Sequence, residues 1–359
     1  MERLTVPKLF GAAKKRLTLF CRLLNRSLKH PSRDSNLLFV SAMPDNGLMR
    51  IPRNQIGNFS SGVARNAHYA AGKAICFETN SPIIAIEARY EYREYMENMT
   101  TMGSSGIDVF RMEQHGPVHL ACIAPSNEVS MHAKGTFETA GVMRQYALLL
   151  PSFAELKSLM IGLSPESSFS ISEMPELPRV LFYGSSITQG CASSRPGLNY
   201  VNIIALEMPC VAINYGFSAS AKGEPEIAEL ISQEHADIYV IEYDHNATVE
   251  ELKKTHLPLY RRVRSSNPES PLIFLSRLSG GVSISLEEAE QRQAIIEETL
   301  RTARTEGDKG VYYISGGFVP FEQRAAFLQD DRHPNDAGMR LLADKIKAII
   351  QEYHLDQTP

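Results

Sequence analysis

The spacing of hydrophobic residues divides the chain into three parts, and the first of these is a short basic segment. Near the N-terminus, hydrophobic residues recur at steps of three or four, which places them on one face of a helix. The first 30 residues carry eight basic side chains and one acidic side chain. We therefore predict a basic amphipathic extension over 1–36, with an apolar face formed by Phe10, Ala13, Leu17, Phe20, Leu24 and Leu28.

In the second part, 37–172, hydrophobic and polar residues alternate in short runs. The clearest runs are at 74–79, 83–90, 107–111 and 146–150. Turn-forming residues separate them, as in Asn80-Ser81-Pro82. Alternation with a period of two indicates strands that bury one face, and many short strands joined by turns are typical of an antiparallel sandwich. We predict a β-sandwich domain here.

In the third part, 173–359, strand-like runs alternate with amphipathic segments of helical length. The predicted strands are 180–183, 211–214, 238–243, 272–275 and 311–314. The predicted helices are near 200–207, 225–233, 249–265, 286–304 and 336–352. Such alternation predicts an α/β domain, in which helices cover both faces of a parallel sheet.

Composition adds limits on function and location. Hydrophobic residues make up 43% of the chain and charged residues 22%, and no apolar run approaches the roughly 20 residues that cross a bilayer. Beyond the first 30 residues the chain is acidic overall, which excludes a broad nucleic-acid surface. The five cysteines are widely spaced and form no C-x-x-C pair, and the N-terminus lacks the continuous apolar stretch of a secretory signal. We predict a cytoplasmic protein.

Four polar segments follow predicted strands or precede the last predicted helix. They are 184–190, 215–218, 244–247 and 330–335. Ligands of an open parallel sheet bind outside the carboxyl ends of its strands, so we expect these segments to meet at one edge. The first segment lacks the Lys of a phosphate loop, and Thr188 takes the place of the second glycine in a G-x-S-x-G elbow. Helix capping is the alternative role for its serines.

These segments contain the partners that a nucleophilic serine needs. Ester cleavage by serine requires a base for its proton, a carboxylate that orients the base, and donors for the oxyanion. Asp330 and His333 are three residues apart, close enough for the carboxylate to hold one imidazole tautomer. Gly216 offers a backbone N–H, and Asn246 offers a side-chain amide.

Together, the four segments resemble the signature blocks of the SGNH or GDSL-type hydrolases. The resemblance implies that Ser186 is the nucleophile, His333 the base and Asp330 its orienting acid. It also implies an oxyanion hole formed by the Ser186 N–H, Gly216 and Asn246. The fold that it implies is a three-layer α/β/α domain with a flavodoxin-like sheet.

The second part of the chain is similar to the jelly-roll domain that precedes one subgroup of these hydrolases. The similarity is carried by 71–82 and 106–110, and in that subgroup the roll lies beside the active site. Two positions depart from the family pattern. Ser185 stands where the family has Asp, and 244–247 reads Asp-His-Asn-Ala, without the family's glycine and final acid. Better-known members therefore do not indicate the substrate.

The sequence thus predicts a serine esterase that cleaves a small-molecule carboxylic ester, such as an acylated sugar or small metabolite, without a metal or organic cofactor. An acyltransferase that uses the same triad is the first alternative, and a glycan-binding protein with a vestigial site is the second. His245, Arg195 and Arg277 are candidate substrate contacts, although a structural His and solvated arginines are the alternatives. The N-terminal helix is expected to pack or to extend freely; docking to an anionic membrane surface is its alternative.

Overall fold

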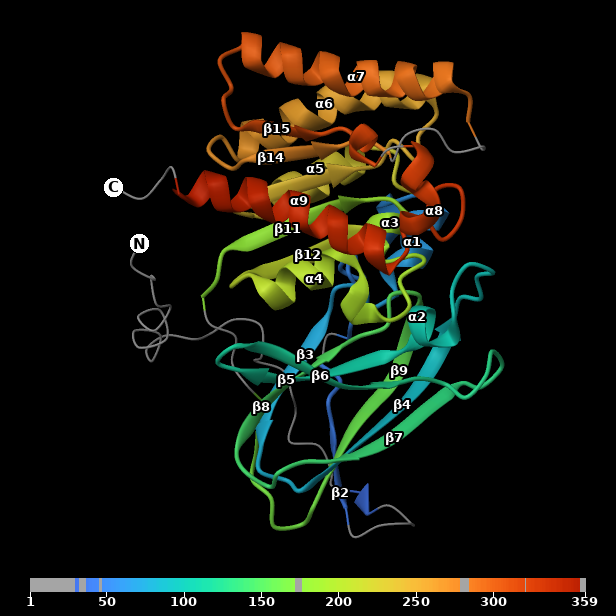
Figure 1. The fold of residues 1–359 in the computed structure, drawn as a ribbon, viewed down its shortest axis with the longest axis vertical. Helices are drawn as coiled ribbons and strands as arrows, with labels where there is room; N and C mark the ends of the chain where they lie inside the picture. Colours follow the sequence, from blue (N-terminus) through green and yellow to red (C-terminus); the bar gives the residue numbers. More distant parts are fainter. Residues whose placement is uncertain are drawn as a thin grey trace.

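The computed structural model describes residues 30–31, 37–44, 47–171, 176–277, 284–319 and 321–355. They form two domains that follow one another along the long axis of the molecule (Figure 1). The amphipathic helix predicted within the first 30 residues lies outside the described residues. Of the predicted extension, the structure describes only β1 (His30–Pro31), which pairs with β2 (Leu38–Ser41).

The first domain is a sandwich of two antiparallel five-stranded sheets, as predicted. One sheet has the order β1, β2, β9 (Ala154–Leu163), β4 (Ile83–Arg93) and β7 (His132–Glu138). The other has the order β10 (Phe169–Ile171), β3 (Ala74–Thr79), β8 (Arg144–Leu149), β5 (Ile107–Glu113) and β6 (Gly116–Ile123). Alternate residues of both sheets, such as Ile84 and Ile86 opposite Phe77 and Val109, fill the space between them. This burial explains the period-two pattern in the sequence.

The second domain contains a five-stranded parallel sheet. Its order is β12 (Val211–Gly216), β11 (Arg179–Gly184), β13 (Ile238–Glu242), β14 (Leu272–Leu275) and β15 (Val311–Ile314). Counted along the domain, the strand order is 2-1-3-4-5, which is that of flavodoxin. All neighbouring strands are parallel, as predicted.

Helices cover both faces of this sheet (Figure 1). One face packs on α4 (Tyr200–Glu207) and α9 (Asp336–Leu355), and the other on α5 (Pro225–Gln233), α6 (Val249–Ser266) and α7 (Leu286–Thr305). Within β11, Val180 and Phe182 face the first pair of helices, while Leu181 and Tyr183 face the other three. The short helices are α1 (Ser61–Ala67), α2 (Thr101–Ser105), α3 (Ser186–Gln189), α8 (Arg324–Phe327) and the 3-10 turns η1 (Ile56–Asn58), η2 (Pro196–Leu198), η3 (Gly316–Phe318) and η4 (Phe321–Gln323).

The segment between β2 and β3 joins the core of the second domain. Ile51 and the α1 residues Val63 and Ala67 are fully buried in the same cluster as Leu181 and Tyr183 of β11. Neighbouring Arg50 is also buried and donates to the carbonyl oxygens of Asn66, Tyr69, Asn214 and Gly216. Part of the predicted sandwich segment therefore packs directly against the parallel sheet of the second domain.

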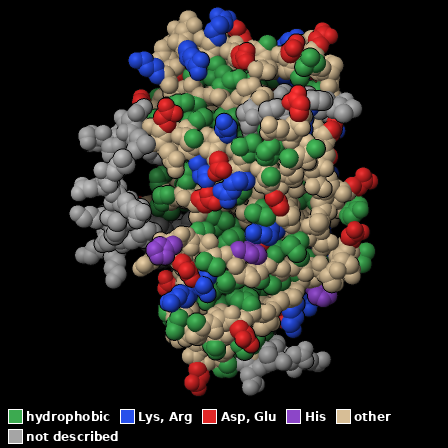
Figure 2. All heavy atoms as spheres, in the orientation of Figure 1, with side chains coloured by type: hydrophobic (Ala, Val, Ile, Leu, Met, Phe, Trp, Pro, Cys, Tyr) green, Lys and Arg blue, Asp and Glu red, His purple; other side chains and the backbone are tan. Residues whose placement is uncertain are grey.

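The surface has a mixed character. On the face shown in Figure 2, basic and acidic side chains of the described residues lie interspersed over most of the area. None of the described helices has both the length and the apolar composition that a bilayer-crossing helix requires.

Candidate active site

The proposed nucleophile lies in a tight turn at the carboxyl end of the central strand β11. The strand ends at Gly184, and Ser185 caps the N-terminus of α3 by accepting a hydrogen bond from the Ile187 N–H at 3.1 Å. Ser186 is the first residue of α3, and Gly190 ends the helix with a left-handed φ of 115°. The strand, cap and helix end together fix the position of Ser186 at the sheet edge.

Glu242, at the end of the adjacent strand β13, holds this turn from beneath. Its Oε2 accepts hydrogen bonds from the Ser185 N–H and Oγ, at 3.2 and 2.8 Å, and from Thr188 Oγ1 at 3.0 Å. Burial, together with the nearby Asp244 carboxylate, raises the pKa of Glu242 to about 8. Sequence reasoning missed Glu242; the loss of the family's Asp at Ser185 was the only signal that another carboxylate was needed there.

The structure brings the three residues of the predicted triad together. Ser186 Oγ lies 2.9 Å from His333 Nε2, and His333 Nδ1 lies 2.8 Å from Asp330 Oδ2. Asp330 and His333 come from the loop between α8 and α9, and His333 lies 147 residues beyond Ser186. The two distances are those of hydrogen bonds, and the order Ser, His and Asp is the one that a catalytic triad requires.

Asp330 is held as a carboxylate by the groups around it. Burial alone would raise its pKa, but hydrogen bonds from the backbone N–H groups of His333 and Arg332 outweigh that effect. The side chains of Asn98 and His333 donate as well, and together these donors hold the pKa of Asp330 below its usual range. An ionised Asp330 favours the imidazole tautomer that carries its proton on Nδ1 and leaves Nε2 free to accept one.

Gly216 has a different role from the one predicted. Its N–H donates to Asn214 Oδ1 at 2.8 Å, so it is not free to bind an oxyanion. A Cβ at this position would lie 2.2 Å from the Gln189 backbone nitrogen, which shows that glycine is needed for close packing of α3 against β12. This engaged N–H corrects the predicted role of Gly216 as a donor.

Two other hydrogen-bond donors, the Ala219 N–H and the Asn246 side chain, lie in or beside the 217–219 turn that follows β12. Ala219 is exposed, has a left-handed φ of 55°, and its N–H has no hydrogen-bond partner among the described residues. The preceding N–H, of Ser218, is bound to Gln189 Oε1, and Asn246 Nδ2 donates to Phe217 O at 3.2 Å. The 217–219 turn therefore lies between the end of α3 and Asn246. A left-handed alanine gave no recognisable signal in the sequence.

The side chains of His245, Glu242 and Asp244 lie close together. Each offers one atom that could bind a metal ion, and these atoms lie within 4.8 Å of one another. Burial, reinforced by the positive charge of Arg277, lowers the pKa of His245 well below its ordinary value, so the ring is neutral. Arg292 donates to the backbone oxygen of Asp244, and the Arg277 N–H donates to Asp244 Oδ2 at 2.9 Å. Two arginines beside the carboxylates already supply positive charge, so we assign no metal to this group.

The two predicted arginines are both engaged within the protein. Arg195 Nη1 donates to the buried Asp108 of β5 at 2.7 Å, which joins the two domains. The same Asp108 oxygen accepts the Gly197 N–H at 2.7 Å. Arg277 is buried at the end of β14. Contact of either arginine with a substrate stays a prediction.

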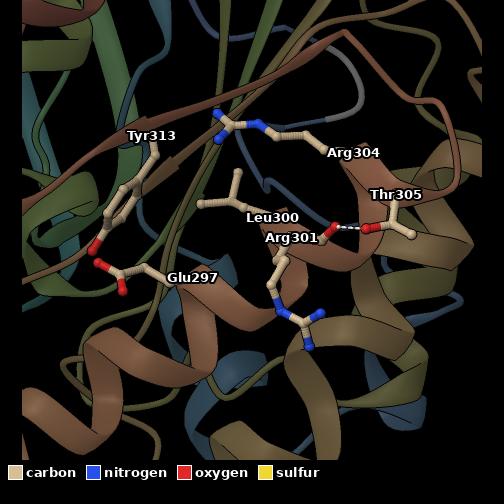
Figure 3. Close-up of a pocket in the computed structure, with 6 residues that line it drawn as sticks. All are labelled: Glu297, Leu300, Arg301, Arg304, Thr305 and Tyr313. Atoms are coloured by element: carbon tan, nitrogen blue, oxygen red, sulfur yellow. Dashed lines mark hydrogen bonds between the residues drawn. The ribbon is translucent and has the colours of Figure 1, made fainter.

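A separate hollow lies away from Ser186, Asp330 and His333. It has a volume of about 510 Å³ and lies between the second half of α7 and β15 (Figure 3). The polar ends of Glu297 and Tyr313 lie close together on one side of it, while the Arg304 and Arg301 side chains extend above and below it in the view. None of the triad residues lines it. Arg301 is paired with Glu298, so the hollow offers no obvious charged ligand site.

The two domains match two separate family descriptions. Residues 178–351 match the GDSL-like Lipase/Acylhydrolase family, and residues 36–169 match a description of the N-terminus of Esterase_SGNH_hydro-type proteins. A comparison with curated protein sequences finds no significant match.

Solved structures share the two-domain fold. A protein from Bacteroides ovatus named as a GDSL-like lipase is 24% identical, with a TM-score of 0.80 over 88% of this chain and 97% of that one. The salicylyl-acyltransferase SsfX3 of a tetracycline biosynthetic pathway is 16% identical, with a TM-score of 0.70 over 90% and 92%. A family two carbohydrate esterase from Clostridium thermocellum, in complex with cellohexaose, is 14% identical, with a TM-score of 0.54 over 79% and 93%. With both domains matched in order, the chain belongs to the SGNH or GDSL-type hydrolase family, in its two-domain form with an N-terminal β-sandwich.

Proposed function

We propose that the protein is a serine esterase that cleaves a carboxylic ester through an acyl-enzyme on Ser186. The observation that carries this proposal is the pair of hydrogen bonds from Ser186 Oγ to His333 Nε2 and from His333 Nδ1 to Asp330, at 2.9 and 2.8 Å. A nucleophile, a base and an orienting acid in this order are the requirements of covalent acyl transfer.

The proposed reaction has two halves. His333 Nε2 takes the proton of Ser186 as Oγ attacks the ester carbonyl, and the imidazolium then gives this proton to the departing alcohol. Water enters, loses a proton to His333 and attacks the acyl-enzyme, which releases the carboxylic acid and restores Ser186. Asp330 stabilises the imidazolium in both halves and stays ionised. No metal or organic cofactor takes part in this scheme.

The oxyanion donors that we assign are the Ser186 N–H, the Asn246 side chain and the Ala219 N–H. The N–H of Ser186 is at the N-terminus of α3 and has no partner among the described residues. Ala219 takes the role expected for Gly216, because its N–H is unengaged and its turn contacts both Gln189 and Asn246. Donors that are already in place stabilise the oxyanion without reorganisation.

We propose a small ester as the substrate, with a short acyl group on a sugar or another small alcohol. Support comes from the carbohydrate esterase that shares the fold, although at 14% identity the likeness is one of fold alone. Acyl transfer to an alcohol is the second candidate function. The fold shared with a salicylyl-acyltransferase favours it, and it would use the same Ser186 and His333.

A panel of esters tests both functions. The purified chain is offered acetyl, butyryl, longer acyl and aryl esters, including acetylated sugars, and the acid released is measured with and without an added alcohol acceptor. We expect hydrolysis of short acyl esters to be fastest. Formation of a new ester faster than hydrolysis supports the acyltransferase, and sugar binding without any turnover contradicts both.

We also propose that the protein works in a reducing compartment, as expected for the cytoplasm. Each of the four described cysteines, Cys76, Cys122, Cys191 and Cys210, is a free thiol. Oxidising compartments favour disulfides, so free thiols across both domains support this location.

A further inference from the structure

The side chains of Asp330 and His333 are contacted by one residue of the sandwich domain, Asn98. Asn98 lies in the loop between β4 and α2 of the sandwich, more than 230 residues before Asp330. Its Nδ2 donates to Asp330 Oδ2 at 2.8 Å and lies 3.2 Å from His333 Nδ1. Among the described residues, Asn98 is the only side chain from outside the 328–335 loop that donates to Asp330.

The loop that carries Asn98 is anchored at both ends. At its start, Glu94 accepts a hydrogen bond from the Tyr69 hydroxyl at 2.6 Å and donates its N–H to Phe153 O at 2.9 Å. At its end, Thr100 caps α2 and contacts Ser194 O of the other domain at 3.4 Å. The loop is therefore fixed by groups that do not take part in the proposed reaction.

The middle of this loop is packed against the second domain. Met96 and Met99 contact a buried cluster formed by Tyr69, Phe153, Cys191 and Ala192, the last two of which follow α3. Cys191 Sγ also donates to Asn98 Oδ1, at 3.7 Å. The amide nitrogen lies 3.5 Å from the same sulfur, so the thiol does not distinguish the two ends of the amide. The orientation follows from Asp330, because its carboxylate can only accept the hydrogen bond that Nδ2 donates.

The loop that carries Asp330 and His333 is closed mainly by hydrogen bonds of its own backbone. A bridge between Leu328 and Pro334 and a hydrogen bond from the Gln329 N–H to His333 O close the loop on itself. The Asp330 side chain is 32% exposed. The backbone N–H groups of Arg332 and His333 both bind Asp330 Oδ1. Asp330 Oδ2, the oxygen that faces the imidazole, is bound by the His333 ring and by Asn98.

We propose that Asn98 is a positioning residue through which the sandwich domain holds Asp330, and with it the His333 ring, in line with Ser186. This inference rests on the proposed esterase function. An amide suits the role because it donates to a carboxylate without adding a charge beside the imidazole. A carboxylate at position 98 would instead repel Asp330 and favour retention of a proton on His333.

Three variants test this role. We expect Asn98→Ala to lower kcat about 10- to 100-fold with little change in KM, because a misplaced base slows the chemical step and not binding. We expect Asn98→Asp to lower kcat as well and to move the rising step of kcat/KM to higher pH, by more than Asn98→Ala does. Glu97→Ala truncates the exposed neighbour in the same loop and is expected to leave both unchanged.

The pH profile separates positioning from a structural role. The other titratable groups near the His333 ring are Asp330, Ser186 and the neutral His245, and Arg277, Arg292 and Arg332 add positive charge around His245. None of them is altered in these variants. Wild-type kcat and an unchanged pH profile in both Asn98 variants would overturn the proposal. So would an equal loss of activity in Glu97→Ala, because it would point to general disruption of the loop.

Two further measurements distinguish a failure of the positioning role from a failure of the proposed esterase function. A fluorophosphonate probe reports on Ser186 without a known substrate, since Oγ displaces fluoride from phosphorus and needs the same base. Labelling of wild type that slows in Asn98→Ala supports the positioning role even if no ester of the panel is cleaved. NMR titration of the His333 ring needs no reaction at all, and identical curves for wild type and Asn98→Asp would overturn the role.

Discussion

The turn that carries Ser186 and the loop that carries His333 are supported in opposite ways. The turn is part of the core: Ser185 and Thr188 are fully buried, and the Glu242 carboxylate beneath them is itself 3% exposed. The loop lies at the surface and is held by its own backbone N–H groups and by Asn98 of the sandwich. Ser186, the proposed nucleophile, is thus positioned by its own domain, while Asp330 and His333 are also contacted by the sandwich domain.

The two carboxylates show what this difference does electrostatically. Burial dominates at Glu242 and raises its pKa to about 8, whereas four donors at Asp330 overcome burial and hold its pKa below the usual range. At neutral pH, Glu242 is therefore a largely protonated structural group and Asp330 is a charged partner of the imidazole. Environments that shift the pKa values of two carboxyl groups in opposite directions in this way give the two groups different tasks.

The largest effect is expected from Ser186→Ala. Removing Oγ removes the attacking atom, so kcat should fall by about 10⁴-fold or more. Because His333 is the only described residue to which the Ser186 side chain forms a hydrogen bond, the melting temperature should stay close to that of the wild type. Steady-state kinetics and a thermal melt check both. Most activity retained by this variant would contradict the assignment of the nucleophile.

A smaller effect on catalysis, and a larger one on stability, is expected from Ser185→Ala. Its hydroxyl caps α3 and donates to Glu242, so its removal should cost about 1–3 kcal/mol of unfolding free energy. We expect kcat to fall less than 10-fold while the melting temperature drops by several degrees. A variant with wild-type stability that has lost its activity would show that Ser185, and not Ser186, is the catalytic serine.

The sequence was informative where structure is local. The five parallel strands and both helical layers followed from periodicity, and the pairing of Asp330 with His333 followed from their short spacing. The choice of Ser186 came from the family resemblance. The predicted helices at 200–207 and 225–233 have the observed boundaries. Each of these features depends on neighbours in sequence, which is why a pattern can reveal it.

Features that depend on distant contacts were not predictable. Asn98 looks like any polar loop residue until the sandwich is placed beside Asp330, and Arg195 looks like a free cation until Asp108 is found opposite. Gly216 suggested an available N–H, but the Asn214 side chain two residues earlier occupies it. The contribution of 51–67 to the second core crosses a domain boundary that alternation alone cannot describe.

The pH dependence of stability is expected to identify Glu242. Its pKa in the folded protein, about 8, exceeds its ordinary 4.5, so between these values the folded state keeps a proton that the unfolded chain has lost. Unfolding free energy should therefore fall as pH rises from about 5 to 8, and Asp244, raised to about 6, contributes in the same direction. Glu242→Gln should flatten this decline. If the melting temperatures of the wild type and Glu242→Gln fall by the same amount between pH 5 and 9, the role assigned to Glu242 is contradicted.

The smallest effect is expected from deleting residues 1–29, which belong to neither the turn nor the loop. Every residue assigned to the proposed chemistry, including Asn98, lies beyond this segment, and the hydrogen bonds of the triad are complete without it. Hydrolysis of a small soluble ester should therefore remain within about twofold of the full chain. The intact protein should also fail to sediment with anionic vesicles at low salt if the basic segment packs or extends freely. A folded truncation without activity would make this segment part of the active site, and salt-sensitive co-sedimentation would make it a membrane contact, at about 1 kcal/mol per basic residue near the surface.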